Sequence, residues 1–357
     1  MLAVIILGIL AVSFAWLAKY RNVAFGLNIS FTLIFIFLAL RYNFGNDYKG
    51  YLDIFIEINK YKSFDLFDKS IHAEPGWILL CKLFKPFGFF AMTAILSLLH
   101  CFIYYSFIKK FVPIRYYWLA VFLYIFNSGF LLVQASAMRQ SVAIEVFIFS
   151  LSYLYKKDAI RYFLCVGIAW LFHSSAVILL PIYLLTYING KINKGGIIIL
   201  ASIFIATFIF IGSIGPYLNQ FVNIYFNQYE GYKEAVVLGS GLGLLFIFIP
   251  FFLTLNYERF QSRETALIFK LVIISFIFIP LGFIIQLIGR MGMYFMPAAL
   301  IVYPVIQMNL KTAIYKYLFL GSLALITLYE FFMFFQSDVW RDAFGNYQTI
   351  FSASKYF

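Results

Sequence analysis

The sequence predicts an all-α polytopic membrane protein with about twelve transmembrane helices. Hydrophobic residues make up 64% of the chain and charged residues 12%, whereas soluble domains average roughly 45–50% and about 25%. Apolar runs long enough to cross a bilayer follow one another along the chain. Lys and Arg gather in short segments between these runs, as in membrane proteins with basic cytoplasmic loops. We expect a single integral membrane domain over residues 1–357.

The transmembrane helices are read from the apolar runs in chain order, because a span needs about twenty apolar residues. They are predicted near 2–18, 22–40, 87–108, 116–135, 139–155, 160–173, 175–189, 196–215, 239–257, 265–287, 291–309 and 317–335. The segment 76–86 is amphipathic and ends at Pro86, so it predicts a short interfacial or re-entrant helix. It belongs to a long loop, 41–86, which is expected to carry short helices.

The orientation follows from the short loops between the spans, because basic loops stay in the cytoplasm. In one set of loops Lys and Arg far outnumber acidic residues: Lys19, Arg21, Lys109, Lys110, Arg115, Lys156, Lys157, Arg161, Lys191, Lys194, Arg259, Arg263, Lys311 and Lys316. This set is predicted to be cytoplasmic. Both termini, the loop 41–75 and a second loop, 216–238, then lie on the outer face.

With this topology, the unusual polar residues fall on the outer face. They are Arg41, Asp47, Glu74, Arg139, Gln140, His173, Arg290 and Tyr294. An arginine in a span costs roughly 2.5–3.5 kcal/mol at the bilayer centre, and less toward the ends. Three arginines on the face that carries fewer basic residues therefore favour a shared anion site. The alternative for any one of them is a side chain that reaches the lipid headgroups.

A phosphate ligand would suit the arginines, because a guanidinium binds phosphate through two parallel hydrogen bonds. Arg139 also begins a helix, where free backbone N–H groups and the helix dipole favour anions. Arg290 and Tyr294 are four residues apart and are expected to share one helix face. Tyr294 as an interfacial aromatic is the alternative.

Other ionisable residues have structural readings that compete with functional ones. His173 stands at a span boundary and is either functional or bonded to a backbone carbonyl. His100 and His72 are expected to be structural. Glu145 lies about 9 Å deeper than Arg139 along its helix, where it is protonated or paired within the bundle.

Several classes of function are excluded by the sequence. The net charge of +12 is explained by loops that contact anionic headgroups, so no nucleic-acid partner is expected. The three cysteines are far apart and form no ligand cluster or disulfide framework. No metal motif, P-loop, Rossmann glycine run or Gly-x-Ser-x-Gly elbow occurs, so we expect no metal and no cofactor. Asp65 and Asp68 are the one alternative, because a loop could bring them to a divalent ion.

Five short motifs, in this order, resemble the EpsG family of bacterial exopolysaccharide proteins, which is allied to the Wzy O-antigen and capsule polymerases. The motifs are Arg41-Tyr-Asn-Phe-Gly-Asn-Asp47-Tyr48, Ala-Glu74-Pro-Gly-Trp77, Met-Arg139-Gln140-Ser-Val-Ala143, Phe172-His173-Ser-Ser and Arg290-Met-Gly-Met-Tyr294. They cover the chain from 41 to about 295. The C-terminal tail departs from the family pattern, because Gly345-Asn346-Tyr347-Gln348 lacks an expected proline, so no tail residue is placed in the site.

The resemblance implies a GT-C-like membrane glycosyltransferase that polymerises lipid-linked oligosaccharide repeat units. Donor and acceptor would both be carried on undecaprenyl pyrophosphate at the outer, periplasmic face of the bacterial cytoplasmic (inner) membrane. The motif residues then divide into pyrophosphate ligands (Arg41, Arg139 and Arg290), candidates for the acceptor side (Asp47, Glu74 and His173) and supporting residues (Gln140 and Tyr294). A flippase and a chain-length regulator are the protein partners that the resemblance implies, besides membrane lipid.

Three other classes of protein remain alternatives. A flippase or transporter of lipid-linked sugars should show inverted repeats and polar residues near the middle of the bilayer. An O-antigen ligase would share the donor and differ mainly in the acceptor. A membrane O-acyltransferase should carry its catalytic histidine on the cytoplasmic side. The polar residues of this chain gather on the predicted outer face, which favours the polymerase.

Overall fold

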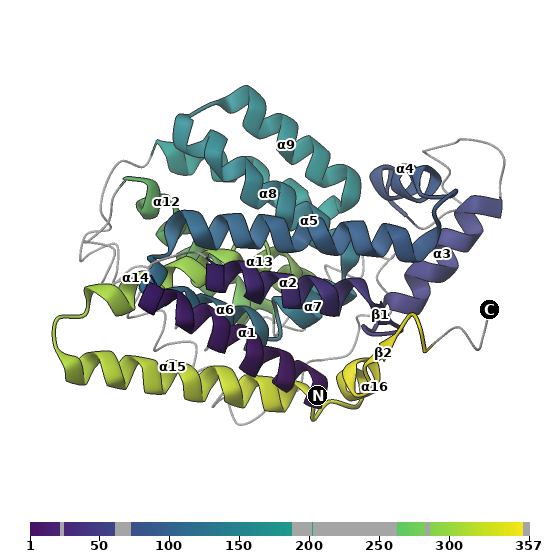
Figure 1. Ribbon diagram of the computed structural model, residues 1–357. Helices are drawn as coiled ribbons and strands as arrows, with labels where there is room; N and C mark the ends of the chain where they lie inside the picture. The colour runs from purple at the N-terminus through teal and green to yellow at the C-terminus, as the bar shows by residue number, and fades with distance from the viewer. Residues whose placement is uncertain (22–24, 61–72, 188–201, 203–262, 283–285, 353–357) are drawn as a thin grey trace. The chain divides into compact units, whose positions relative to one another are not determined.

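The computed structural model describes residues 1–21, 25–60, 73–187, 202, 263–282 and 286–352 (Figure 1). These residues are mostly helical, and their single sheet consists of two strands of two residues each. Contacts divide the chain into two compact units: residues Met1–Leu180 with Tyr303–Phe357, and residues Pro181–Val302. The predicted spans 196–215 and 239–257 and the predicted loop 216–238 lie outside the described residues.

Three described helices are long and apolar enough to cross a membrane: Leu2–Lys19 within α1 (Leu2–Arg21), α5 (Gly88–Phe111) and α15 (Ala313–Phe334). Shorter apolar helices of 10–17 residues cover Phe25–Ala39, Ile114–Phe126, Ala159–Phe172, Ser174–Thr186, Thr265–Phe278 and Met296–Asn309. The chain is therefore a helical membrane protein, as its composition predicts. The total of about twelve spans stays a prediction.

Small residues let the first helices of the larger unit approach closely. An added Cβ at Gly26 of α2 (Phe25–Ala39) would lie 2.1 Å from the Phe14 carbonyl oxygen of α1. Ser30, one turn later, donates to the Ala11 carbonyl oxygen at 2.6 Å. Such contacts replace the hydrophobic effect as a source of helix association in lipid. Helix α2 packs on α5, α5 packs on α8 (Met138–Lys156), and α8 packs on α9 (Ala159–Phe172).

The prediction of one continuous helix over 116–135 is wrong. Helix η1 (Ile114–Tyr116) and α6 (Tyr117–Phe126) end at Asn127, and the short α7 (Leu131–Ser136) follows. The Asn127 side chain accepts a hydrogen bond from the Gly129 amide at 3.1 Å, which is a local turn that competes with the helix. The predicted helix 175–189 is also different, because Ser174–Thr186 forms the 3₁₀-helix η2 with Pro181 inside it.

The smaller unit contains α12 (Arg263–Gly282), α13 (Gln286–Gly292) and η5 (Met296–Ala298). An added Cβ at Gly292 would lie 2.8 Å from Phe278 Cβ, so α13 and α12 pack closely. The predicted helix 291–309 begins only with α14 (Ala299–Asn309), because residues between Met293 and Ala298 form turns and η5.

Short elements gather at one end of α5 in the larger unit (Figure 1). They are β1 (Arg41–Tyr42), α3 (Tyr48–Lys60), α4 (Pro75–Leu83), α16 (Asp338–Phe344) and β2 (Gln348–Thr349). Helix α3 is amphipathic and buries residues at helical spacing, and α4 corresponds to the predicted short helix 76–86. The Met1 amino group reaches the Phe344 carbonyl oxygen at this end.

At the other end of α5, Lys110 Nζ lies 5.3 Å from the centre of the ring of Tyr155, which is near the end of α8. The Tyr117 hydroxyl donates to the Lys109 carbonyl oxygen there. The helix ends predicted for one side of the membrane thus meet each other within this unit. Which end faces the periplasm stays a prediction.

Candidate functional site

The segment 41–48 packs against the end of α7 (Leu131–Ser136). The Asp47 amide donates to Ser136 Oγ at 3.2 Å, and the Tyr48 hydroxyl donates to the Arg41 carbonyl oxygen at 3.1 Å. Gly45 has a φ of 127°, and an added Cβ would lie 3.2 Å from Ser136 Cα. A side chain at this position would be strained by its backbone conformation and would push the segment away from α7.

Arg139 and Glu74 form the most direct ion pair among the predicted site residues. Arg139 Nη1 donates to Glu74 Oε2 at 2.5 Å, and both side chains are mostly buried, with 24% and 20% of their area exposed. The guanidinium lies 5.6 Å from the centre of the Tyr51 ring. Burial raises the pKa of Tyr51, so its hydroxyl stays neutral beside the arginine. Glu74 is therefore an anionic partner of Arg139 in this structure.

Glu74 owes its position to α4, which packs against the end of α9. Glu74 is the N-cap of α4, with Pro75 in the first turn where its missing N–H costs nothing. Gly76 lies directly on α9, because an added Cβ would be 2.8 Å from the Leu171 carbonyl oxygen. Trp77 and Tyr51 belong to one buried cluster with Met138, and Phe172 packs against it. The motifs around Glu74, Arg139 and His173 thus share one hydrophobic support.

His173 ends α9 in an extended backbone conformation. Its Nδ1 lies 2.6 Å from Ser175 Oγ, and the Ser175 amide donates to the same nitrogen at 3.4 Å. The side chain of Ser175, two residues later, is therefore a polar contact of the His173 ring. The ring is half-buried.

Arg41 is buried, with 4% of its area exposed. Its Nη1 donates to the Leu38 carbonyl oxygen (3.1 Å) and Ser97 Oγ (3.3 Å), and its Nη2 donates to the Ala135 carbonyl oxygen (3.4 Å). Burial lowers the pKa of Arg41, and burial raises the pKa of Tyr48 to about 12. Arginine keeps its charge at any physiological pH.

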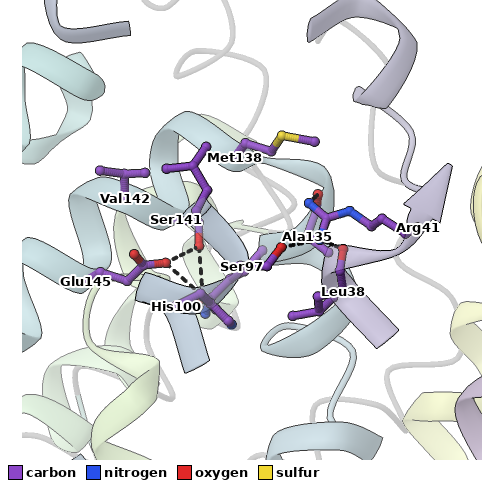
Figure 2. Close-up of a pocket in the computed structure, with 11 residues that line it drawn as sticks. Leu38, Arg41, Ser97, His100, Ala135, Met138, Ser141, Val142 and Glu145 are labelled. Carbon is purple, nitrogen blue, oxygen red and sulfur yellow. Dashed lines mark hydrogen bonds and ion pairs between the residues drawn. The ribbon is translucent and has the colours of Figure 1, made fainter. Parts of the chain in front are cut away.

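Arg41 lines a small cavity together with residues of α5, α7 and α8 (Figure 2). Across it, His100 Nδ1 lies 2.7 Å from Glu145 Oε1, and Ser141 Oγ donates to the same oxygen at 2.9 Å. Glu145 is therefore paired within the bundle, which was one of the two states predicted for it. The partner is His100, which the sequence alone does not indicate.

The C-terminal tail packs directly on the Arg41 segment, although the sequence pattern gave no reason to place it there. Strands β1 and β2 are antiparallel, with Arg41 opposite Thr349. The Tyr347 ring stacks on Phe37 with centroids 4.2 Å apart, and its hydroxyl donates to the Phe37 carbonyl oxygen at 2.7 Å. The tail therefore supports the first motif through backbone pairing and ring contacts.

The remaining predicted residues are buried or belong to the smaller unit. Gln140 is 1% exposed on α8. Arg290 lies in the last turn of α13, and Tyr294, which is 1% exposed, follows the end of that helix. The expectation that Arg290 and Tyr294 share one helix face is wrong, because α13 ends at Gly292.

Within the described ranges, no group of three or more His, Cys, Asp or Glu side chains is placed to hold a metal ion. Asp65 and Asp68, the alternative metal ligands, lie outside those ranges.

Comparison with known proteins gives one informative match. The model of the EpsG family matches residues 25–349, which is nearly the whole chain. No curated protein and no solved structure matches it.

Proposed function

Because the chain belongs to the EpsG family, a Wzy-like polymerase family, we propose that it polymerises oligosaccharide repeat units carried on undecaprenyl pyrophosphate. The family implies a glycosyltransferase-like membrane polymerase that acts on lipid-linked oligosaccharide. The carrier lipid, the periplasmic face of the inner membrane as the place of reaction and a GT-C-like architecture belong to the proposal. The product would be an O-antigen, capsule or exopolysaccharide.

The Arg139–Glu74 pair is the observation that supports this proposal best. It stands at the start of α8, beside the Asp47 segment and next to the end of α9 that bears His173. A phosphate group is a stronger partner for a guanidinium than one carboxylate oxygen, because it offers bidentate contact and more charge. Donor pyrophosphate would therefore compete with Glu74 for Arg139.

This exchange would link donor binding to acceptor activation. The sugar–phosphate bond of the donor breaks as the acceptor hydroxyl oxygen bonds to the anomeric carbon, and undecaprenyl pyrophosphate leaves. Arg139 would stabilise the charge that develops on that leaving group. Glu74, released from Arg139, would be free to accept the proton of the acceptor hydroxyl.

The other predicted residues have positions that suit supporting parts of the same mechanism. Asp47 and His173 would orient the acceptor sugar from the segments beside Glu74. Arg41 is too buried to meet an exposed ligand in this structure. It would contribute a positive electrostatic potential to the site without contacting the ligand. Gln140 and Tyr294, both buried, would hold Arg139 and Arg290 in place.

A deletion strain tests the function directly. Loss of long surface chains, with a single repeat unit retained on the cell surface, is the expected phenotype. Loss of all surface polysaccharide would contradict the proposal and indicate a flippase, and free polymer that is not attached to its final acceptor would indicate a ligase. Purified protein with a lipid-linked repeat unit should then make polymer without a nucleotide.

A further inference from the structure

The Phe44 ring, three residues before Asp47, contacts three other aromatic rings. Phe44 is buried, with 0% of its area exposed. Its ring centre lies 5.5 Å from that of Phe37, 4.9 Å from that of Phe344 and 5.3 Å from that of Tyr347, all edge-to-face. Phe37 belongs to α2, whereas Phe344 ends α16 and Tyr347 follows it. We call these four residues the Phe44 cage, and two of them come from the C-terminal part of the chain.

Tyr347 contributes both a ring contact and a hydrogen bond to the Phe44 cage. Its ring stacks on Phe37 with centroids 4.2 Å apart and planes inclined by 15°, and its hydroxyl donates to the Phe37 carbonyl oxygen at 2.7 Å. Stacked and edge-to-face pairs are both favourable arrangements of aromatic rings. A single side chain therefore holds the ring and the backbone of Phe37 and also contacts the ring of Phe44.

Backbone hydrogen bonds join the same two parts of the chain. The Gly45 amide donates to the Ala343 carbonyl oxygen of α16 at 3.0 Å, and the Ile350 amide donates to the Leu40 carbonyl oxygen at 2.9 Å. Figure 1 shows β1, β2 and α16 beside one another. Each strand has only two residues, and a two-stranded sheet is marginal by itself. The ring contacts of the Phe44 cage are therefore a further source of stability for this pairing.

The backbone from Asn43 to Asp47 has unusual torsion angles. Asn43, with a φ of 45°, adopts the left-handed conformation, which a non-glycine residue keeps only where its surroundings hold it. Gly45 follows with a φ of 127°. Asp47 then begins the first turn of α3, because its carbonyl oxygen accepts from the Tyr51 amide at 2.9 Å. The place of Asp47 is thus set by the short segment that the Phe44 cage holds.

We propose that Tyr347 is a positioning residue for Asp47, because it holds the segment 43–47 in the conformation that places Asp47 at the start of α3. This inference rests on the proposed function, in which Asp47 orients the acceptor sugar. It brings the C-terminal tail into the site, where the sequence pattern gave no reason to place it. Tyr347 acts through the segment rather than on the reacting atoms.

Hydrogen exchange tests this contact without any measure of activity. Tyr347→Leu keeps an apolar side chain but removes the stacked ring and the hydroxyl. In purified protein in detergent, peptides that cover residues 43–48 should exchange about tenfold faster than in the wild type, because the Gly45 and Asp47 hydrogen bonds open more often. Unchanged exchange in these peptides would overturn the proposal.

A double-mutant cycle on polymerisation tests whether Tyr347 acts through Asp47. Tyr347→Leu should lower kcat about tenfold, because a misplacement of about 1 Å can cost about 10²-fold in rate. Asp47→Asn should lower kcat in the wild type but change it little further in Tyr347→Leu, since Asp47 is already misplaced there. Equal factors for Asp47→Asn in both backgrounds would overturn the positioning role.

The conservative variant Tyr347→Phe keeps both ring contacts and should accumulate as the wild type does. It loses the hydrogen bond to Phe37, so exchange of residues 43–48 should rise about two- to fivefold, less than in Tyr347→Leu. Its kcat should also fall less than that of Tyr347→Leu. Unchanged exchange in Tyr347→Phe would overturn the proposal, even if Tyr347→Leu accumulated too poorly to be measured.

Tyr317→Leu is the matched control, because it removes a tyrosine of α15 that is 75% exposed. It should leave both the exchange of residues 43–48 and kcat as in the wild type. Losses in Tyr317→Leu equal to those in Tyr347→Leu would overturn the proposal. Wild-type protein that makes no polymer would instead contradict the proposed function, and the exchange data would still decide whether Tyr347 holds the segment.

Discussion

Replacement of Gly76 by alanine should impair the site without preventing folding. An added Cβ would lie 2.8 Å from the Leu171 carbonyl oxygen and 3.0 Å from the Leu171 carbonyl carbon, both of which are backbone atoms. Carbon–oxygen contacts normally begin near 3.3 Å, so α4 and the end of α9 must separate by about 0.5 Å. Overpacking of this kind costs about 1–3 kcal/mol, partly offset by about 0.5–1 kcal/mol from the helix propensity of alanine.

The effect on polymerisation should exceed the effect on stability. Gly76 stands two residues after Glu74, so the displacement changes how Glu74 meets Arg139. A misplacement of about 1 Å can cost about 10²-fold in rate, and half of that displacement should cost about tenfold. The measurement is the initial rate of polymer formation by purified protein, together with the chain-length distribution of the surface polysaccharide in cells.

Gly50→Ala is the matched control, because Gly50 also lies in a short helix of the same loop and has nothing within 4 Å of an added Cβ. Its rate should equal that of the wild type. Equal rates for the Gly76 and Gly50 variants would refute the reasoning that the close approach of α4 to α9 sets the position of Glu74.

Three other predictions concern charge, topology and metal. Arg139→Lys and Arg290→Lys should each lose most polymerisation while the protein still accumulates, because an ammonium cannot make the two parallel hydrogen bonds of a guanidinium; wild-type chain lengths would favour side chains that only reach the headgroups. Reporter fusions at Lys60 and Gly345 should report the periplasm and one at Lys157 the cytoplasm, and a cytoplasmic signal at Lys60 would contradict the site's location. Purified protein should polymerise a lipid-linked repeat unit in excess EDTA, whereas activity that requires Mg²⁺ or Mn²⁺ would indicate that the acidic loop binds metal.

Composition and charge predict the helical membrane class well, because both depend on averages over many residues. The short helix after Glu74 is also visible in the sequence, since Glu74-Pro75 is a helix start and apolar residues follow. The break at Asn127 is harder to see, because apolar residues continue on both sides of the turn. Hydropathy averages over a window and therefore hides a turn of four residues.

The contacts within the site could not be predicted in the same way. Arg139 and Glu74 were both expected at one face, yet the sequence does not show that they bind each other, because their 65-residue separation carries no pairing signal. Tyr51 was missed as the aromatic neighbour of Arg139, although its place on the buried stripe of α3 gave a signal at helical spacing. The pairing of Glu145 with His100 depends on how α5 and α8 face each other.

The pairing of β1 with β2 has a consequence for biosynthesis. Tyr347 and Phe37, which stack beside these strands, are 310 residues apart in the chain. At a synthesis rate of about 5–20 residues per second, the segment that pairs with Arg41 emerges roughly 15–60 s after Arg41 itself. During that interval the backbone N–H and C=O groups of the Arg41 segment that pair with β2 in the folded protein lack that partner. A chain that is still being synthesised therefore lacks the pairing of β1 with β2. A chain truncated before Gln348 would insert without the strand that pairs with Arg41.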